Sequence, residues 1–313
     1  MPRVSRRIRR LLPTAAAVTA LTAVVACQGS GQGPPGARAR TASSSPAPSQ
    51  QARTVPADPA HTVRAALDGL PRGTSRTGRY AVAVKDLRTG DCVVHGSAGA
   101  YAAFDTASVV KVDVLAALLL QAQDQGAGLS EERRRLASAM IRDSDNAATD
   151  ALWRAIGGAD GLRAANARLG LTATTPGDGG RWGLTRTTAA DQLTLLEAVF
   201  AGDADSSPLD RASRAYVRSL MASVRADQRW GVPAAGDAED ADDAALKNGW
   251  LPRTATGLWD VNSVGRIEAG GRAYLVTVLS DGQPSHRAGI DLVERVAKTA
   301  VGALGDGGAG KAS

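Results

Sequence analysis

The sequence contains few of the cysteine and histidine residues on which most metal and thiol sites depend. Its 313 residues include 2 cysteines and 3 histidines, and aromatic residues make up 4% of the chain. The histidines, His61, His95 and His286, form no His-x-x-x-His pair, so we do not expect a zinc site. No Gly-x-Ser-x-Gly motif is present, which argues against a Ser-His-Asp hydrolase. We therefore expect no metal and no other cofactor.

The N-terminus has the pattern of a secretory signal peptide, which we assign to residues 1–27. Residues 1–10 carry five arginines, and an apolar run that is too short to span a bilayer comfortably follows at 11–26. The segment Val24 to Cys27 resembles a bacterial lipobox. This resemblance implies that Cys27 carries a diacylglycerol, whose two chains anchor the exported protein to the outer face of the cytoplasmic membrane. The alternative is an ordinary signal followed by an incidental cysteine.

Composition divides the rest of the chain into three parts. Residues 28–60 are rich in Gly, Ser, Pro, Ala and Gln, cannot bury enough apolar surface to fold, and are typical of a disordered tether. Residues 61–305 are expected to form one domain, and residues 306–313 a short disordered tail. Cys92 has no partner if Cys27 is acylated, so we expect no disulfide and predict that Cys92 is a small buried side chain.

The net charge of +6 belongs mostly to the exported segment. Removal of the five signal arginines leaves +1, and the tether contributes three arginines against Asp58, so the domain itself is near −1. A basic surface for nucleic acid is therefore not indicated. We expect a monomer whose partners are a small substrate and, through its anchor, the membrane.

Strand-like segments lie at both ends of the domain, and helical segments lie between them. The expected elements are, in chain order, a helix at 61–70, strands at 80–86 and 91–95, helices between 108 and 223, strands at 245–247, 258–267 and 273–279, and a helix at 288–301. This order predicts an α/β (α+β) fold. An antiparallel sheet formed from the N- and C-terminal strands would be flanked by helices, with an all-helical lobe beside it.

Ser108 and Lys111 lie at the start of a strongly apolar helical segment, Val112 to Leu120. Residues three apart share a helix face, so the hydroxyl and the amine are predicted to be neighbours. A lysine can activate a serine only when its amine is neutral, which burial favours. The chain has 37 basic residues but only five lysines, and arginine cannot lose its proton in a protein. For this pair alone, a chance match is the alternative.

Two tripeptides add polar groups further along the chain. Ser144, Asp145 and Asn146 fall in a break between two helical segments, where an ordinary N-cap is the alternative interpretation. Lys247-Asn248-Gly249 follows a strand-like segment. There the lysine would supply a positive charge and the glycine would let a ligand approach the backbone closely, a surface lysine and a turn glycine being the alternative.

Taken together and in this order, the three motifs resemble the Ser-x-x-Lys, Ser-Asp-Asn and Lys-Thr-Gly set of class A β-lactamases and penicillin-binding proteins. The resemblance covers about Tyr80 to Val301 and includes the lead-in from Phe104 to Ser108. It implies a β-lactamase/transpeptidase-like fold and a serine hydrolase that acts on β-lactams through an acyl-enzyme. A peptidoglycan D-Ala-D-Ala peptidase is the alternative, and a non-catalytic cell-envelope lipoprotein that binds cell-wall peptide is a second one.

The resemblance also implies roles for individual residues. Ser108 would attack the carbonyl carbon, Lys111 would be the acylation base or part of its relay, and Ser144 would pass the proton to the leaving nitrogen. Asn146 would contact a side-chain amide of the substrate. Lys247 and Asn248, followed by Gly249, would hold its carboxylate. The backbone N–H groups of Ser108 and Trp250 would form the oxyanion hole.

The match departs from the family at three points. Asn248 replaces the usual Thr or Ser, and the stretch 108–144 is shorter than in typical class A enzymes. Class A enzymes also carry a glutamate that activates the deacylating water, in a loop that should correspond to residues 169–187. This loop contains no glutamate, and its one carboxylate, Asp178, is better suited to a turn. Acylation is therefore better supported than turnover. Trp182, in the same loop, is a candidate for the cleft lining.

Overall fold

The computed structural model describes residues 58–70, 78–202, 206–239 and 243–309. The predicted signal peptide, Cys27, almost all of the predicted tether and the last four residues, 310–313, lie outside this part of the chain. Among the residues that are described, no helix combines the length and the apolar composition needed to cross a membrane.

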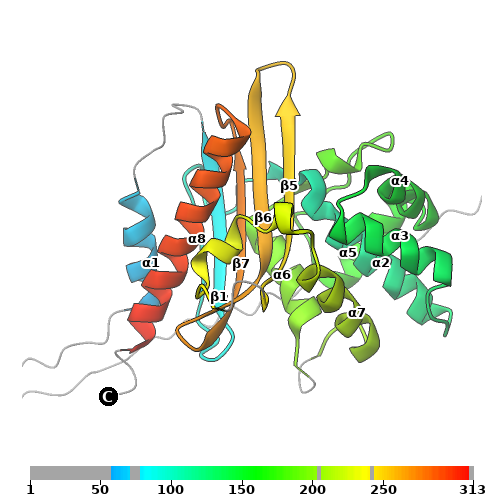
Figure 1. The fold of residues 1–313 in the computed structure, drawn as a ribbon, viewed down its shortest axis with the longest axis horizontal. Coiled ribbons are helices and arrows are strands. Elements are labelled where there is room, and N and C mark those ends of the chain that lie inside the picture. Colours follow the sequence, from blue (N-terminus) through cyan, green and yellow to red (C-terminus); the bar gives the residue numbers. More distant parts are fainter. Residues whose placement is uncertain (1–57, 71–77, 203–205, 240–242, 310–313) are drawn as a thin grey trace, which may run out of the picture. The chain divides into compact units, whose positions relative to one another are not determined.

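A five-stranded antiparallel sheet forms the centre of the domain (Figure 1). Its strands, in the order β2-β1-β7-β6-β5, are β2 (Cys92–Gly96), β1 (Arg79–Asp86), β7 (Arg272–Asp281), β6 (Leu258–Ala269) and β5 (Ala245–Arg253). Because β1 pairs with both β2 and β7, the N-terminal hairpin joins the sheet beside the C-terminal strands. The predicted α/β fold, with an antiparallel sheet built from the two ends of the domain, is confirmed.

Helices cover both faces of this sheet (Figure 1). On one face, α8 (His286–Ala309) packs against β1, β6 and β7, and α1 (Pro59–Asp68) lies beside it. On the other face, α6 (Ala189–Phe200) packs against β1, β6 and β7. The helical lobe beyond it consists of α2 (Val110–Asp124), α3 (Glu131–Arg142), α4 (Asn146–Ala155), α5 (Gly158–Leu169) and α7 (Arg211–Ala222).

Helix α2 is the central helix of the lobe because it is apolar on almost every side. All residues from Val110 to Leu120 are buried, and α2 contacts α3, α4, α5 and α7. A helix that is hydrophobic all round must lie inside the protein. Two charged residues near its start, Lys111 and Asp113, are therefore carried into the interior.

Two elements extend beyond their predicted ends. Strand β5 continues through Gly249 to Arg253, because an edge strand tolerates Pro252 and the antiparallel ladder with β6 remains regular. Helix α8 continues to Ala309, so the start of the predicted disordered tail is helical. Its glycines weaken the helix, but the fully buried side chain of Leu304 anchors this last part to the core.

The prediction that Cys92 is buried was wrong. Cys92 is the first residue of β2, which is an edge strand of the sheet. Consecutive side chains of a strand lie on opposite faces, so Val93 enters the core and the thiol of Cys92 is exposed.

Candidate active site

Ser108 lies in a short turn that leads directly into α2. This turn, η1 (Ala107–Val109), is a 3-10 helix, and with the preceding Thr106 it is called the Ser108 turn below. Ala107 has φ 46°, a left-handed conformation that costs a residue with a side chain about 1–3 kcal/mol. Ser144 is the other non-glycine residue with a positive φ in the described part of the chain. Ser108 itself is partly exposed, so its hydroxyl can meet a ligand.

Two buried residues hold the Ser108 turn against the sheet. Asn262 on β6 donates through Nδ2 to the carbonyl oxygens of Asp105 (2.9 Å) and Thr106 (3.0 Å). Gly249 on β5 lies so close that a Cβ atom there would be 2.7 Å from the backbone nitrogen of Ser108. The close approach that Gly249 permits is therefore made by the protein's own turn, whereas the sequence suggested a ligand.

Lys111 stands in the first turn of α2 with a fully buried side chain. Its Nζ donates to the backbone oxygen of Ser144 (2.6 Å), to Ser144 Oγ (3.0 Å) and to Asn146 Oδ1 (2.9 Å). Burial lowers the pKa of the amine to about 7, against the opposing effect of the carboxylates of Asp145 and Asp150. Near neutral pH, the amine is therefore partly neutral and can accept a proton.

Neighbouring residues in the loop before α4 have different contacts. Asp145 is the N-cap of α4 and its carboxylate accepts from a helix N–H, so the N-cap interpretation holds for this residue. Ser144 and Asn146, on either side of it, contact Nζ of Lys111. In the described residues, the hydrogen bonds of Lys111 lead to this loop and not directly to Ser108.

The two side chains expected to hold a substrate carboxylate, Lys247 and Asn248, are not among the residues that line the cleft described below. Lys247 is completely buried, and its Nζ donates to the backbone oxygen of Asn248 (2.8 Å). Burial, with a smaller effect of Lys111, lowers the pKa of Lys247 well below its usual range. Asn248 donates through Nδ2 to the backbone oxygens of Gln228 and Trp230, both at 2.8 Å. Asn248 thus fastens the segment before β5, on the side of the strand opposite to Lys247, since consecutive side chains of a strand point in opposite directions.

A cleft of about 350 Å³ opens beside Ser108. Its lining combines the Ser108 turn, the start of α4, the segment 180–184 and the middle of β5. Of the predicted site residues, Ser108, Asn146 and Trp250 line the cleft, whereas the side chains of Lys111 and Lys247 are buried behind its surface. The volume suits a small ligand.

The loop between α5 and β4 (Arg186–Thr187) presents an indole to Lys111. Trp182, in the short turn η2 (Trp182–Leu184), lies with its ring centroid 4.9 Å from Nζ of Lys111. Its Nε1 donates to Oδ1 of Asp150 on α4 (2.8 Å). Asp178, the only carboxylate of the loop, is exposed and does not line the cleft, as expected of a turn residue.

Sequence reasoning missed Asp150 and the contact between Trp182 and Lys111. Asp150 follows Asn146 by four residues on α4, and this spacing already indicated a shared helix face. An aromatic residue among the glycines of a short loop was the available signal for Trp182. No sequence pattern distinguished Asn262, because its role depends on where β6 passes the Ser108 turn.

Fold and cleft together define a protein of the β-lactamase-like class. The chain belongs to the β-lactamase enzyme family, whose model matches residues 127–304, more than half of the sequence. The matched segment contains the Ser144 and Lys247 motifs and begins after Ser108 and Lys111.

The relatives that match by sequence are named as lipoproteins. The LppW proteins of Mycobacterium tuberculosis and Mycobacterium bovis, described by their name as candidate lipoproteins, are 32% identical over 176 residues. The alignment covers 55% of this chain and 54% of LppW, so the chain matches about half the length of these relatives.

Solved structures share the fold at low sequence identity. A class A β-lactamase from Bacteroides cellulosilyticus superposes with a TM-score of 0.66 at 17% identity, covering 79% of this chain and 99% of its own. A mutant of PBP-A in an acyl-enzyme complex with penicillin G gives a TM-score of 0.64 at 18% identity, covering 79% of this chain and 97% of its own. A β-lactamase from Chitinophaga pinensis gives 0.63 at 19% identity, covering 78% and 98%. At these identities the likeness concerns the fold alone.

Proposed function

We propose that this chain is a serine acyl-transfer enzyme that opens β-lactams through an acyl-enzyme on Ser108 and releases the acyl group slowly. The observation that carries the proposal is the buried amine of Lys111. Its pKa of about 7 suits a general base that works near neutral pH, and it lies one helical turn from a partly exposed serine in a cleft.

Acylation requires the proton of the Ser108 hydroxyl to leave as the oxygen attacks. In the proposed step, the neutral amine of Lys111 takes this proton while Oγ bonds to the lactam carbonyl carbon. The developing oxyanion would accept hydrogen bonds from the backbone N–H groups of Ser108 and Trp250, each worth about 3 kcal/mol in such sites. The close packing of β5 on the Ser108 turn at Gly249 supports this pairing.

Cleavage of the lactam C–N bond then requires a proton on the leaving nitrogen. Ser144 Oγ lies 3.0 Å from Nζ of Lys111, so the proposed path runs from the lysine through this hydroxyl to the nitrogen. The net change is one C–O bond formed, one C–N bond broken and one proton moved from Ser108 to the nitrogen. Lys111 returns to its neutral state.

We attribute the slow release of the acyl group to the residue that the 169–187 loop places against Lys111, which is a tryptophan. An indole can neither accept a proton from water nor orient one as a carboxylate would. Trp182 covers Nζ, and Asp178 is exposed and outside the cleft lining. A D-Ala-D-Ala peptidase that uses the same acylation step is the second candidate, and the missing deacylating carboxylate favours it over rapid β-lactam hydrolysis.

Labelling with a fluorescent penicillin, followed by intact-mass analysis, tests the proposal. We expect the wild type to gain the mass of the intact penicillin and the Ser108→Ala variant to gain none, while nitrocefin turnover stays slow. Rapid nitrocefin turnover would contradict slow release. A folded wild type that is neither labelled nor active would overturn the enzyme proposal and favour a cell-envelope binding protein.

We further propose that residues 1–27 direct export, that Cys27 carries the lipid anchor, and that residues 28–60 tether the domain to the outer face of the cytoplasmic membrane. The arginine-rich and apolar N-terminal sequence and the LppW relatives support this proposal. A Cys27→Ser variant should leave the membrane fraction, with Cys92→Ser as the matched control that stays there. An unchanged distribution of the Cys27→Ser variant would contradict lipid attachment.

A further inference from the structure

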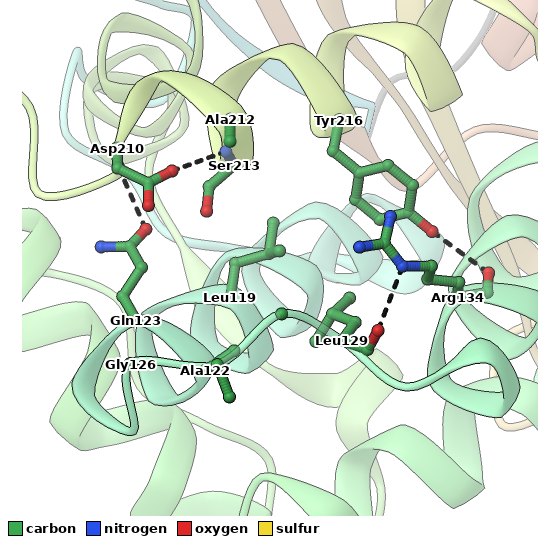
Figure 2. A pocket seen from close by; sticks show the side chains of 12 residues that line it. Leu119, Ala122, Gln123, Gly126, Leu129, Arg134, Asp210, Ala212, Ser213 and Tyr216 are labelled. Carbon is green, nitrogen blue, oxygen red and sulfur yellow. Dashed lines mark hydrogen bonds between the residues drawn. The ribbon is translucent and has the colours of Figure 1, made fainter.

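A second cavity, of about 480 Å³, lies within the helical lobe (Figure 2). It shares no lining residue with the cleft beside Ser108. Leu119 and Ala122 of α2 and the nearby Leu129 provide apolar surface, and the loop 126–128 forms one side. Cavities of this size hold small ligands when a few polar groups converge on them.

One end of the cavity carries a positive charge. The guanidinium of Arg134 on α3 lies over the ring of Tyr216 at 5.7 Å from its centroid, and its Nε donates to the backbone oxygen of Leu129 (3.1 Å). The hydroxyl of Tyr216 donates back to the oxygen of Arg134 (3.1 Å). The arginine is thus held in place, yet within the described residues no carboxylate pairs with it.

The opposite end carries a negative charge (Figure 2). Asp210 is the N-cap of α7, where its Oδ1 accepts from the backbone nitrogen of Ser213 (2.7 Å), and its own N–H donates to Oε1 of Gln123 (3.1 Å). Among the described residues no cation pairs with this carboxylate. The side chain of Ser213, only 7% exposed, points into the cavity, and its hydroxyl has no hydrogen-bond partner in the described part of the chain.

We propose that this cavity binds a small zwitterionic peptide of amino-acid to dipeptide size. Its carboxylate would meet Arg134, its ammonium group Asp210 and the hydroxyl of Ser213, and its short apolar side chains the surface of Leu119 and Ala122. Two fixed opposite charges at the two ends of one cavity match a ligand with free amino and carboxyl termini. A simple anion or a simple cation would be attracted by only one of the two charges.

Calorimetric titration of the purified protein with L-alanyl-L-alanine tests this proposal. We expect Arg134→Gln and Asp210→Asn each to weaken binding by about ten-fold or more, the loss expected for one charge-assisted hydrogen bond. Asparagine is as good an N-cap as aspartate, so Asp210→Asn leaves α7 intact. Arg135→Gln, at an exposed neighbouring position on the same helix, is the matched control and should bind like the wild type.

Dipeptides with one blocked terminus show which terminus of the ligand lies at which end of the cavity. N-acetylation should weaken binding to the wild type but add little further loss in the Asp210→Asn variant, and C-terminal amidation should behave in the same way with Arg134→Gln. The proposal is wrong if the free dipeptide does not bind at millimolar concentrations, or if neither substitution changes its affinity. It is also wrong if penicillin acylation of Ser108 abolishes dipeptide binding, because the ligand would then occupy the other cleft.

Discussion

Trp182 covers the amine of Lys111, with its ring centroid 4.9 Å from Nζ. The indole is itself fixed, because its Nε1 donates to the carboxylate of Asp150. Asp150 therefore acts on Lys111 in two ways: it orients the ring above the amine, and its charge opposes the lowering of the lysine pKa by burial. These two effects can be separated experimentally without touching Ser108.

The rate of Ser108 acylation should rise with pH around a midpoint of about 7. In the proposed step the neutral amine of Lys111 is the base, its pKa is lowered to about 7, and protonation at lower pH would remove this base. Stopped-flow or quenched penicillin labelling between pH 5 and 9 measures this profile. A Lys111→Arg variant should lose labelling at every pH, because arginine keeps its proton, and a labelled arginine variant would rule out the lysine as base.

Asp150→Asn should shift that midpoint to lower pH. Asparagine retains an oxygen acceptor for the indole of Trp182 but removes a charge that raises the pKa of Lys111. The same labelling profile measures the shift. Asp178→Asn is the matched control in the facing loop and should leave the midpoint in place, since Asp178 is exposed and outside the cleft. A shift of equal size in both variants would show a general surface-charge effect instead.

Asn262→Ala should slow acylation by about ten-fold to a hundred-fold, since small displacements of a reacting group have effects of this size. The substitution releases the carbonyl oxygens of Asp105 and Thr106, which hold the Ser108 turn. It should also lower the free energy of unfolding by about 1–3 kcal/mol, because two buried acceptors and the backbone N–H of Ser280 lose a partner.

Ser280→Ala separates positioning from stability in this experiment. Its hydroxyl donates to the oxygen of Val261 on the neighbouring strand and does not contact the Ser108 turn. We expect this variant to lose stability with little change in the labelling rate. If both variants slow labelling in proportion to their loss of stability, Asn262 has no separate positioning role.

Asp113→Asn should stabilise the protein, and the gain should be larger at pH 7 than at pH 5. Burial raises the pKa of Asp113 to about 7, and its Oδ1 has no hydrogen-bond partner among the described residues. Above the unfolded pKa the unfolded state loses this proton while the folded state keeps it, so the wild type loses stability as pH rises toward 7.

The advantage of Asp113→Asn over the wild type should therefore grow by on the order of 2 kcal/mol between pH 5 and 7. Urea unfolding at the two pH values measures it. Asp124→Asn, at an exposed position on the same helix, should show no comparable pH-dependent gain. A gain that is equal at both pH values would mean that Asp113 does not titrate in this range.

The sequence predicted the architecture well because its evidence was local and strong. Strand patterns at both ends of the domain and the strongly apolar segment of α2 allowed few arrangements other than an antiparallel sheet with a helical lobe. The spacing of Ser108 and Lys111 placed both residues at the start of one helix, which the structure contains. The matched family and the solved structures agree with the predicted fold.

Side-chain direction could not be predicted where it depends on strand register. Lys247 and Asn248 were expected to face a substrate together, yet β5 runs on as a regular strand and buries both. Asn248 instead satisfies two backbone oxygens of a segment some twenty residues earlier in the chain, a contact that no short motif encodes. The predicted burial of Cys92 was wrong for a related reason, since the exposure of this residue depends on which strand forms the edge of the sheet.

The contact between Gly249 and Ser108 also limits which amino-acid substitutions the cleft can accept. Any larger residue at 249 would push against the backbone of Ser108, so this position of the strand must remain glycine. Variation that alters ligand preference is left to the lining positions outside the Ser108 turn, which are Asn146, residues 180–184, Trp250 and Leu251. Homologues that acquire new substrates should therefore differ at these positions while keeping glycine at 249.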